Sequence, residues 1–267
     1  MAERLELEGV TIAYEERAGT DRSPTIVFVH GLGGSARSWW AQIAACAKRG
    51  HRAIAYDQRG AGLSSKPEGP YSVELWARDL VRVLDALDID RPLLVGHSVG
   101  CMISERACVE LGERVAGLVT IGGALKWREE AAPVFEERVR LARAGRMDEI
   151  AATVVGTGLS EERRRTDPVL TGLFWELIAS NESQSYADWS AATAPGSMVE
   201  PERVVCPVLA CCGEHDPVTP PTFAQAIADA VPDGRTAVVR GAAHWCHLEA
   251  PDAVNEILLG FAEELAT

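Results

Sequence analysis

A serine stands between two glycines in the segment Gly96-His97-Ser98-Val99-Gly100, which fits the pattern G-x-S-x-G. The segment follows an apolar run that predicts a strand, and it precedes a helical pattern. The serine is therefore expected at a sharp turn from strand to helix. Glycines around such a turn allow a strained backbone without a clash at Cβ. This context predicts that Ser98 is an exposed nucleophile.

A serine hydroxyl is a weak nucleophile at neutral pH. It therefore needs a base that takes its proton and an acid that orients the base. Two histidines near the C-terminus are candidate bases, His244 and His247, and two carboxylates in one short segment are candidate acids, Glu214 and Asp216. Both segments follow predicted strands. The ends of different strands converge on one crevice in an open α/β sheet, so we expect an acid and a base to meet there.

Short apolar runs alternate with helical patterns along most of the chain. The predicted strands are residues 25–30, 53–57, 92–96, 115–121, 208–212 and 236–240, and the predicted helices are residues 38–48, 72–87, 99–111, 221–230 and 251–265. Nearly continuous apolar strands are typical of a sheet that is covered on both faces. Their alternation with helices predicts a mostly parallel sheet joined by right-handed crossovers. Residues 6–17 instead predict an opening hairpin that turns at Glu8-Gly9.

The pattern changes in the middle of the chain. Residues 125–195 show helical patterns without a convincing strand, and they are richer in Arg, Glu and Trp. We interpret them as a helical cap inserted over the carboxyl edge of the sheet. The core domain then comprises residues 1–124 and 196–267.

Several motifs fall in the order found in the α/β-hydrolase superfamily, which the chain resembles over essentially its full length. They are His30-Gly31-Leu32-Gly33-Gly34, the segment from Asp57 to Ser64, the G-x-S-x-G segment, the segment from Gly213 to Pro220, and Gly241-Ala242-Ala243-His244. The resemblance implies an α/β-hydrolase fold, with helices on both faces of the sheet and a helical cap. Within the superfamily, the chain is most similar to 3-oxoadipate enol-lactonases and carboxylesterase-like members.

The resemblance also implies roles for individual residues. It assigns a catalytic triad to Ser98, Asp216 and His244, with Glu214 and His247 as the alternatives for acid and base. Backbone N–H groups of Leu32 and Val99 would form the oxyanion hole that stabilises a tetrahedral intermediate.

Tryptophans near these motifs are candidates for an apolar substrate pocket, because small-molecule sites are mostly apolar. The candidates are Trp39, Trp40, Trp127, Trp175, Trp189 and Trp245. The expected substrate is thus a small, largely apolar metabolite.

The expected reaction is hydrolysis of a carboxylic ester or lactone through an acyl-enzyme. A C–C bond hydrolase uses the same triad and remains an alternative. A non-catalytic ligand-binding member of the fold is a second alternative, against which the intact triad and oxyanion loop argue. Epoxide hydrolases and haloalkane dehalogenases would need an aspartate nucleophile where Ser98 stands.

Composition limits the partners. A formal net charge of −13 disfavours binding to nucleic acid, which requires a basic face. No segment reaches the roughly 20 apolar residues that span a bilayer, and the first residues lack the pattern of a signal peptide, so we expect a cytoplasmic protein without a membrane partner.

The seven cysteines show no zinc-ligand spacing and are expected to be reduced, buried thiols. Neither a metal nor a cofactor is implied, and the sequence does not indicate the oligomeric state.

Overall fold

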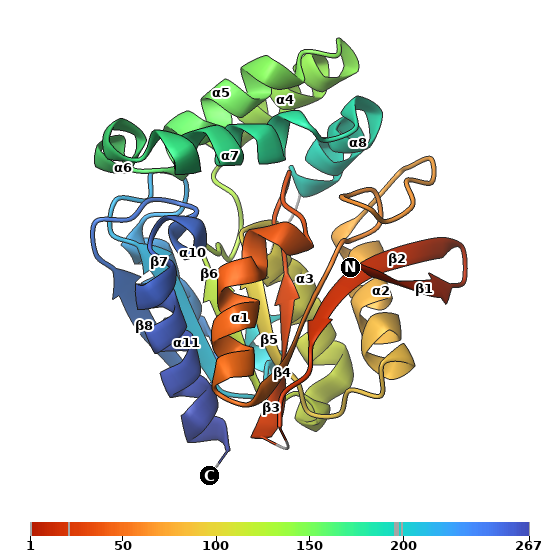
Figure 1. The fold of residues 1–267 in the computed structure, drawn as a ribbon, viewed down its shortest axis with the longest axis vertical. Helices are drawn as coiled ribbons and strands as arrows, with labels where there is room; N and C mark the ends of the chain where they lie inside the picture. The colour runs from red at the N-terminus through yellow and green to blue at the C-terminus, as the bar shows by residue number, and fades with distance from the viewer. Residues whose placement is uncertain (1, 21, 195–197, 199, 267) are drawn as a thin grey trace.

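The core of the molecule is an eight-stranded sheet. The structure, a computed structural model, describes residues 2–20, 22–194, 198 and 200–266. The strand order is β1-β2-β4-β3-β5-β6-β7-β8 (Figure 1). The strands are β1 (Glu3–Leu7), β2 (Val10–Arg17), β3 (Arg22–Val29), β4 (His51–Tyr56), β5 (Leu93–His97), β6 (Gly117–Ile121), β7 (Val208–Gly213) and β8 (Gly234–Val239). Strands β3 to β8 pair in parallel, whereas β1 and β2 form antiparallel pairs at one edge. The predicted mostly parallel sheet is confirmed.

Helices cover both faces of this sheet. Helices α1 (Trp40–Lys48) and α11 (Pro251–Leu265) contribute to the apolar core on one face, and α2 (Val73–Ala86), α3 (Val99–Leu111) and α9 (Pro221–Ala230) contribute to the core on the other. The alternation of side chains along β3 shows why both faces are apolar. Ile26 and Phe28 enter the first core, and Val27 and Val29 enter the second.

The opening hairpin also agrees with the sequence pattern. Strands β1 and β2 are joined at Glu8 and Gly9, and Gly9 has a φ of 77°, a conformation that favours glycine. A short helix, α10 (Cys246–Glu249), was not predicted.

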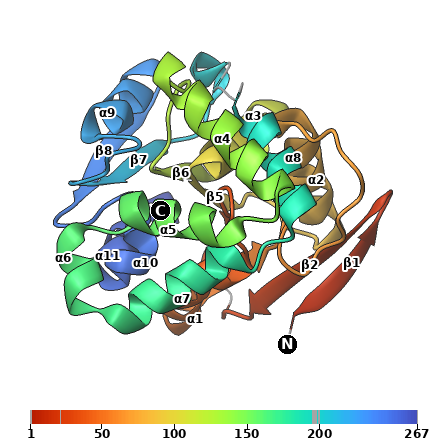
Figure 2. The ribbon, with the colours of Figure 1, turned by 90° about the horizontal axis from the view of Figure 1, so that it is seen from above.

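Among the described residues between β6 and β7 there are five α-helices. They are α4 (Ala132–Arg143), α5 (Met147–Gly158), α6 (Glu161–Thr166), α7 (Pro168–Ala179) and α8 (Ser183–Thr193). Figure 1 shows them lying across one end of the sheet, and Figure 2 shows them from above. Helix α4 packs against α8, and α5 packs against α7. The predicted boundary between Pro195 and Gly196 lies outside the described residues.

Two further features bear on the expectations from composition. All seven cysteines are buried and none forms a disulfide. Among the helices in the described ranges, none is both long and apolar enough to cross a membrane.

Candidate active site

Ser98 occupies the turn between β5 and α3. Its φ is 54° and its ψ is −121°, a backbone conformation that is strained for a residue with a side chain. The Ser98 N–H donates to the carbonyl of Ile121 at 2.9 Å, which ties the turn to the end of β6. A Cβ on Gly96 would lie 2.5 Å from the Gly100 oxygen, and a Cβ on Gly100 would lie 2.3 Å from the Val29 oxygen. Both glycines are therefore required by close backbone approaches.

The loop after β3 passes directly beside this turn. A Cβ on Gly31 would lie 3.0 Å from the Cβ of Ser98. The Gly34 N–H donates to the Gly31 carbonyl at 3.0 Å, which closes a turn with Leu32 and Gly33 as its central residues. Gly33 has a φ of 76°, as the third residue of a type II turn requires. The Leu32 N–H takes no part in the hydrogen bond that closes this turn, so the turn leaves it available as a donor.

The second predicted oxyanion donor lies at the start of α3. Val99 is the first residue of that helix, and the first N–H groups of a helix have no intrahelical acceptor. The whole residue is buried at the base of the serine turn. The loop that carries Leu32 therefore passes beside Ser98, and Val99 follows Ser98 directly in the sequence.

His244 and Asp216 form a buried pair. They are 6% and 3% exposed, and Nδ1 of His244 donates to Oδ2 of Asp216 at 2.8 Å. Burial acts to raise the pKa of Asp216, but the charge and hydrogen bond of His244, together with hydrogen bonds from Thr219, outweigh it and lower the pKa. Asp216 is therefore a carboxylate at neutral pH, and it fixes the proton of His244 on Nδ1.

Thr219 completes the environment of the carboxylate. Oδ1 of Asp216 accepts from the N–H groups of Val218 and Thr219, both at 2.8 Å, and Oδ2 accepts from the Thr219 hydroxyl at 2.8 Å. Sequence reasoning did not identify Thr219. One signal in the sequence could have indicated it: Thr219 follows Asp216 by three residues in a turn segment, where Asp and Thr side chains often form hydrogen bonds with the nearby backbone.

The His244 ring lies beside the serine turn. A Cβ on Gly122, the residue after Ile121, would lie 3.0 Å from Nδ1 and from Cε1 of His244. In addition, the ring of His97 is hydrogen-bonded through Nε2 to the His244 carbonyl at 3.1 Å. Since Asp216 engages Nδ1, Nε2 is the ring nitrogen of His244 that can accept the proton of Ser98.

Glu214 and His247, the alternatives for acid and base, do not belong to the pair of Asp216 and His244. Glu214 is exposed, and its carboxylate accepts the N–H of Gly241 at 2.9 Å. His247 is fully buried and stacks on Trp39 with the ring centroids 4.3 Å apart. Burial, aided by the charge of His244, lowers the pKa of His247 to about 3. Within the described structure neither ring nitrogen of His247 has a hydrogen-bond partner, so Asp216 does not orient it.

Two of the predicted pocket tryptophans, Trp39 and Trp40, lie in opposite environments. Trp39 is fully buried between Phe28, with ring centroids 4.9 Å apart, and His247. Trp40 is 54% exposed, and its indole N–H donates to Glu15 on β2 at 2.7 Å. The first ring fills the core below α1 and the second lies on the surface. Because Trp39 is fully buried, the expectation that it lines a pocket is corrected, whereas that for Trp40 stays a prediction.

The other four tryptophans lie in or against the helices above the sheet. Trp245 packs against Phe174 of α7, with ring centroids 4.8 Å apart, and Trp175 lies partly exposed on the same helix. Trp127 is half-buried beside α4. Trp189 is buried in α8, where its indole N–H donates to the Arg59 carbonyl at 2.8 Å, so it also holds the loop after β4.

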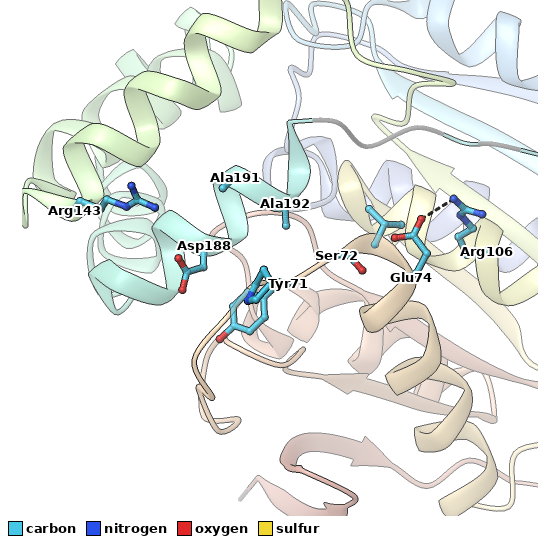
Figure 3. Close-up of a pocket in the computed structure, with 10 residues that line it drawn as sticks. Tyr71, Ser72, Glu74, Arg106, Arg143, Asp188, Ala191 and Ala192 are labelled. Carbon is cyan, nitrogen blue, oxygen red and sulfur yellow. Dashed lines mark hydrogen bonds and ion pairs between the residues drawn. The ribbon is translucent and has the colours of Figure 1, made fainter.

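Two surface cavities lie outside the serine site. One, of about 520 Å³, lies between the start of α2, α3, α4 and α8 (Figure 3). Glu74 and Arg106 form an ion pair of 2.8 Å at one end of it, and Asp188 and Arg143 lie at the other. The second, of about 740 Å³, is lined in part by His215 and Pro217, which flank Asp216. Ser98 lines neither of these two cavities.

No group of three or more His, Cys, Asp or Glu side chains in the described ranges is arranged to hold a metal ion. The part of the chain around Ser98 combines a serine on a strained turn with a buried, hydrogen-bonded pair of Asp216 and His244.

Comparisons with known proteins identify the family of this chain. A model of the alpha/beta hydrolase fold family matches residues 24–251. RutD of Azorhizobium caulinodans, which carries the provisional name carbamate hydrolase, is 29% identical over 90% of this chain and 91% of its own. The 3-oxoadipate enol-lactonase 2 of Acinetobacter baylyi is 28% identical over 94% of this chain and 92% of its own.

Solved structures give the same result for the fold. The enol-lactonase from Burkholderia xenovorans LB400 superposes with a TM-score of 0.90 at 24% identity, and the alignment covers 97% of this chain and 99% of the other. The family model alone spans most of the chain, and the strand order and the serine turn agree with it. The chain belongs to the α/β-hydrolase fold family.

Proposed function

We propose that this protein is a serine hydrolase that cleaves a carboxylic ester or lactone of a small, largely apolar metabolite. Ser98 is the nucleophile, His244 the general base and acid, and Asp216 the residue that orients His244. The backbone N–H groups of Leu32 and Val99 form the oxyanion hole.

In the first half of the reaction, Nε2 of His244 takes the proton of Ser98 as Oγ attacks the acyl carbon. The carbonyl π electrons move to oxygen, and the resulting oxyanion is stabilised by the two N–H groups. When the tetrahedral intermediate collapses, the bond to the leaving oxygen breaks. His244 returns the proton to that oxygen, which leaves an acyl-enzyme on Ser98.

In the second half, water replaces the alcohol. His244 takes a proton from the water, the hydroxide attacks the acyl carbon, and the same N–H groups stabilise the second oxyanion. Collapse releases the carboxylic acid and returns the proton to Ser98. Throughout both halves, the Asp216 carboxylate stabilises the imidazolium form of His244 without accepting its proton.

One observation carries this proposal: the buried hydrogen bond of 2.8 Å between Asp216 and His244 lies against the strained turn that presents Ser98. A purely ligand-binding protein has no need of an ionised, fully hydrogen-bonded aspartate behind a histidine. The enol-lactonase among the relatives supports an ester or lactone as the substrate. The name of RutD suggests carbamates as further candidate substrates, because they are acyl compounds that the same chemistry can cleave. A C–C bond hydrolase is the alternative that shares the triad.

We further propose that helices α4 to α8 act as a cap that selects the substrate. They lie above the loops that carry the triad; α7 supplies Trp175, and Trp127 packs against Phe135 of α4. Contacts remote from the reacting bond can contribute several kcal/mol by orienting the substrate.

Turnover of a panel of candidate substrates tests the proposed function. Purified protein would be assayed with p-nitrophenyl acetate and butyrate, with simple lactones, with an aryl carbamate and with a dienoic C–C substrate. Hydrolysis of the ester or lactone is expected. Cleavage of the C–C substrate alone would replace the proposal with the alternative, and binding without turnover of any compound would indicate a non-catalytic member.

A further inference from the structure

Glu249 is a buried carboxylate that the reaction described above does not use. It ends the short helix α10, five residues after His244, and it is 3% exposed. A buried carboxylate is costly unless hydrogen bonds compensate for the water that it loses. Its partners therefore indicate what the residue is for.

The carboxylate joins two segments that are far apart in the sequence. One oxygen accepts the N–H of Ala243, the residue before His244, at 2.8 Å. The same carboxylate accepts the N–H of Ser160 at 3.1 Å and 3.2 Å, and also the Ser160 hydroxyl. Ser160 is the N-cap of α6, where its Oγ accepts the N–H of Arg163 at 3.2 Å. Glu249 thus connects the His244 loop to the junction of α5 and α6.

A second contact holds the other side of His244. The N–H of Trp245 donates to the carbonyl of Gly158, the last residue of α5, at 2.9 Å. Ala243 and Trp245, the two neighbours of His244, are therefore both tied to residues 158–160. The backbone of His244 lies between these two attachments, so the position of its ring depends on how residues 158–160 pack against the sheet domain.

We propose that Glu249 is a positioning residue: it sets His244 for proton transfer by fastening the backbone next to it to Ser160. This inference rests on the proposed function. Glu249 does not touch the reacting atoms, and it acts through the placement of the imidazole. A misplacement of about 1 Å at a catalytic group can cost about 100-fold in rate.

The first test uses kinetic constants. Glu249→Gln places an amide N–H₂ against backbone donors and breaks at least one contact, so kcat for a p-nitrophenyl ester should fall by about 100-fold. KM should stay within about threefold, because no substrate contact is lost. Ser160→Ala removes one of the three donors and should reduce kcat by a smaller factor of about 10.

A matched control lies in the same loop. Glu214 also accepts a backbone N–H before His244, that of Gly241, but it is exposed and makes no contact with the α5–α6 junction among its described bonds. Glu214→Gln should leave kcat within about twofold. An equal loss for Glu214→Gln and Glu249→Gln would overturn the proposal.

Combining variants distinguishes positioning from a general structural role. If Glu249 acts only through His244, then Glu249→Gln should cause no further loss in a His244→Ala background. An additional loss of about 100-fold in that background would show that Glu249 supports the fold instead. Should Glu249→Gln fail to fold, Ser160→Ala in both backgrounds provides the same comparison.

Labelling keeps this inference separate from the proposed function. The rate at which a fluorophosphonate modifies Ser98 also depends on His244, but it needs no natural substrate. Slower labelling in Glu249→Gln supports positioning even if every ester and lactone of the panel fails. Unchanged labelling and unchanged kcat would refute the positioning role while leaving the hydrolase intact. No labelling of the wild-type protein would refute both.

Discussion

At the scale of single residues, the chemistry of this molecule depends on which polar groups are satisfied. Asp216 accepts four hydrogen bonds from three residues, so it remains ionised although it is buried. Glu214, two residues earlier, is exposed and bonds the backbone of Gly241. The turn thus points one carboxylate inward and the other outward, which gives them different roles.

Replacing Asp216 with Asn should reduce kcat by about 10⁴-fold, because an amide N–H₂ at this position favours the imidazole tautomer with the proton on Nε2. That tautomer cannot accept the proton of Ser98. Steady-state kinetics with a p-nitrophenyl ester measure the loss, and circular dichroism checks the fold. If Glu214→Gln gave the larger loss, the acid would have to be Glu214.

At the scale of elements, a few close backbone approaches determine the geometry of the site. Strand β5, helix α3 and the end of β3 meet at glycines because no side chain fits between them. Both the G-x-S-x-G pattern and the apolar strand before it were visible in the sequence, so the serine turn could be predicted without a structure.

Gly100→Ala should therefore reduce the free energy of unfolding by about 1–3 kcal/mol, as overpacking does, and should impair turnover. The added Cβ would lie 2.3 Å from the Val29 backbone oxygen, which cannot move away as a flexible side chain could. Denaturant unfolding measures the loss. Gly156→Ala in α5 is the control, because no atom lies within 4 Å of its added Cβ, and it should stabilise the helix by about 0.5–1 kcal/mol. Equal effects at both positions would contradict the crowding argument.

Other contacts could not be predicted from the sequence, for a physical reason. Ser160 and Glu249 are separated by 89 residues, and neither position has a local pattern that indicates its partner. The expectation for Trp39 failed for a related reason. An aromatic side chain near a motif can face a pocket, the core or solvent, and only the packing of α1 shows that Trp39 is buried and Trp40 exposed. Local patterns predicted elements and motifs, whereas long-range packing decided the directions of side chains.

At the scale of the whole molecule, several histidines are buried in the core. Burial is the main cause that lowers the pKa values of His30, His97 and His247 below the ordinary value of 6.5. These side chains bind protons less readily in the folded protein than in the unfolded chain. Their contribution to stability is therefore fully present above pH 6.5 and is lost as the pH decreases toward the folded pKa values.

His247→Phe should reduce this dependence. The pKa of His247 is about 3 in the folded protein, so between pH 6.5 and 4 its replacement should remove about 1 kcal/mol per pH unit from the slope of the free energy of unfolding. Urea denaturation at a series of pH values measures the slope. Above pH 7 the slopes of the two proteins should coincide. If the free energies of unfolding of the two proteins changed in parallel through the acidic range, His247 would not contribute to the pH dependence of stability.

The central claim, that Ser98 is the activated nucleophile, is tested most directly by covalent labelling. Intact mass spectrometry after treatment with a fluorophosphonate should show one adduct, and peptide mapping should locate it on Ser98. Ser98→Ala should not be labelled, should remain folded, and should lose about 10⁴- to 10⁶-fold of the turnover of a p-nitrophenyl ester. An adduct on another residue, or normal turnover by Ser98→Ala, would contradict the account.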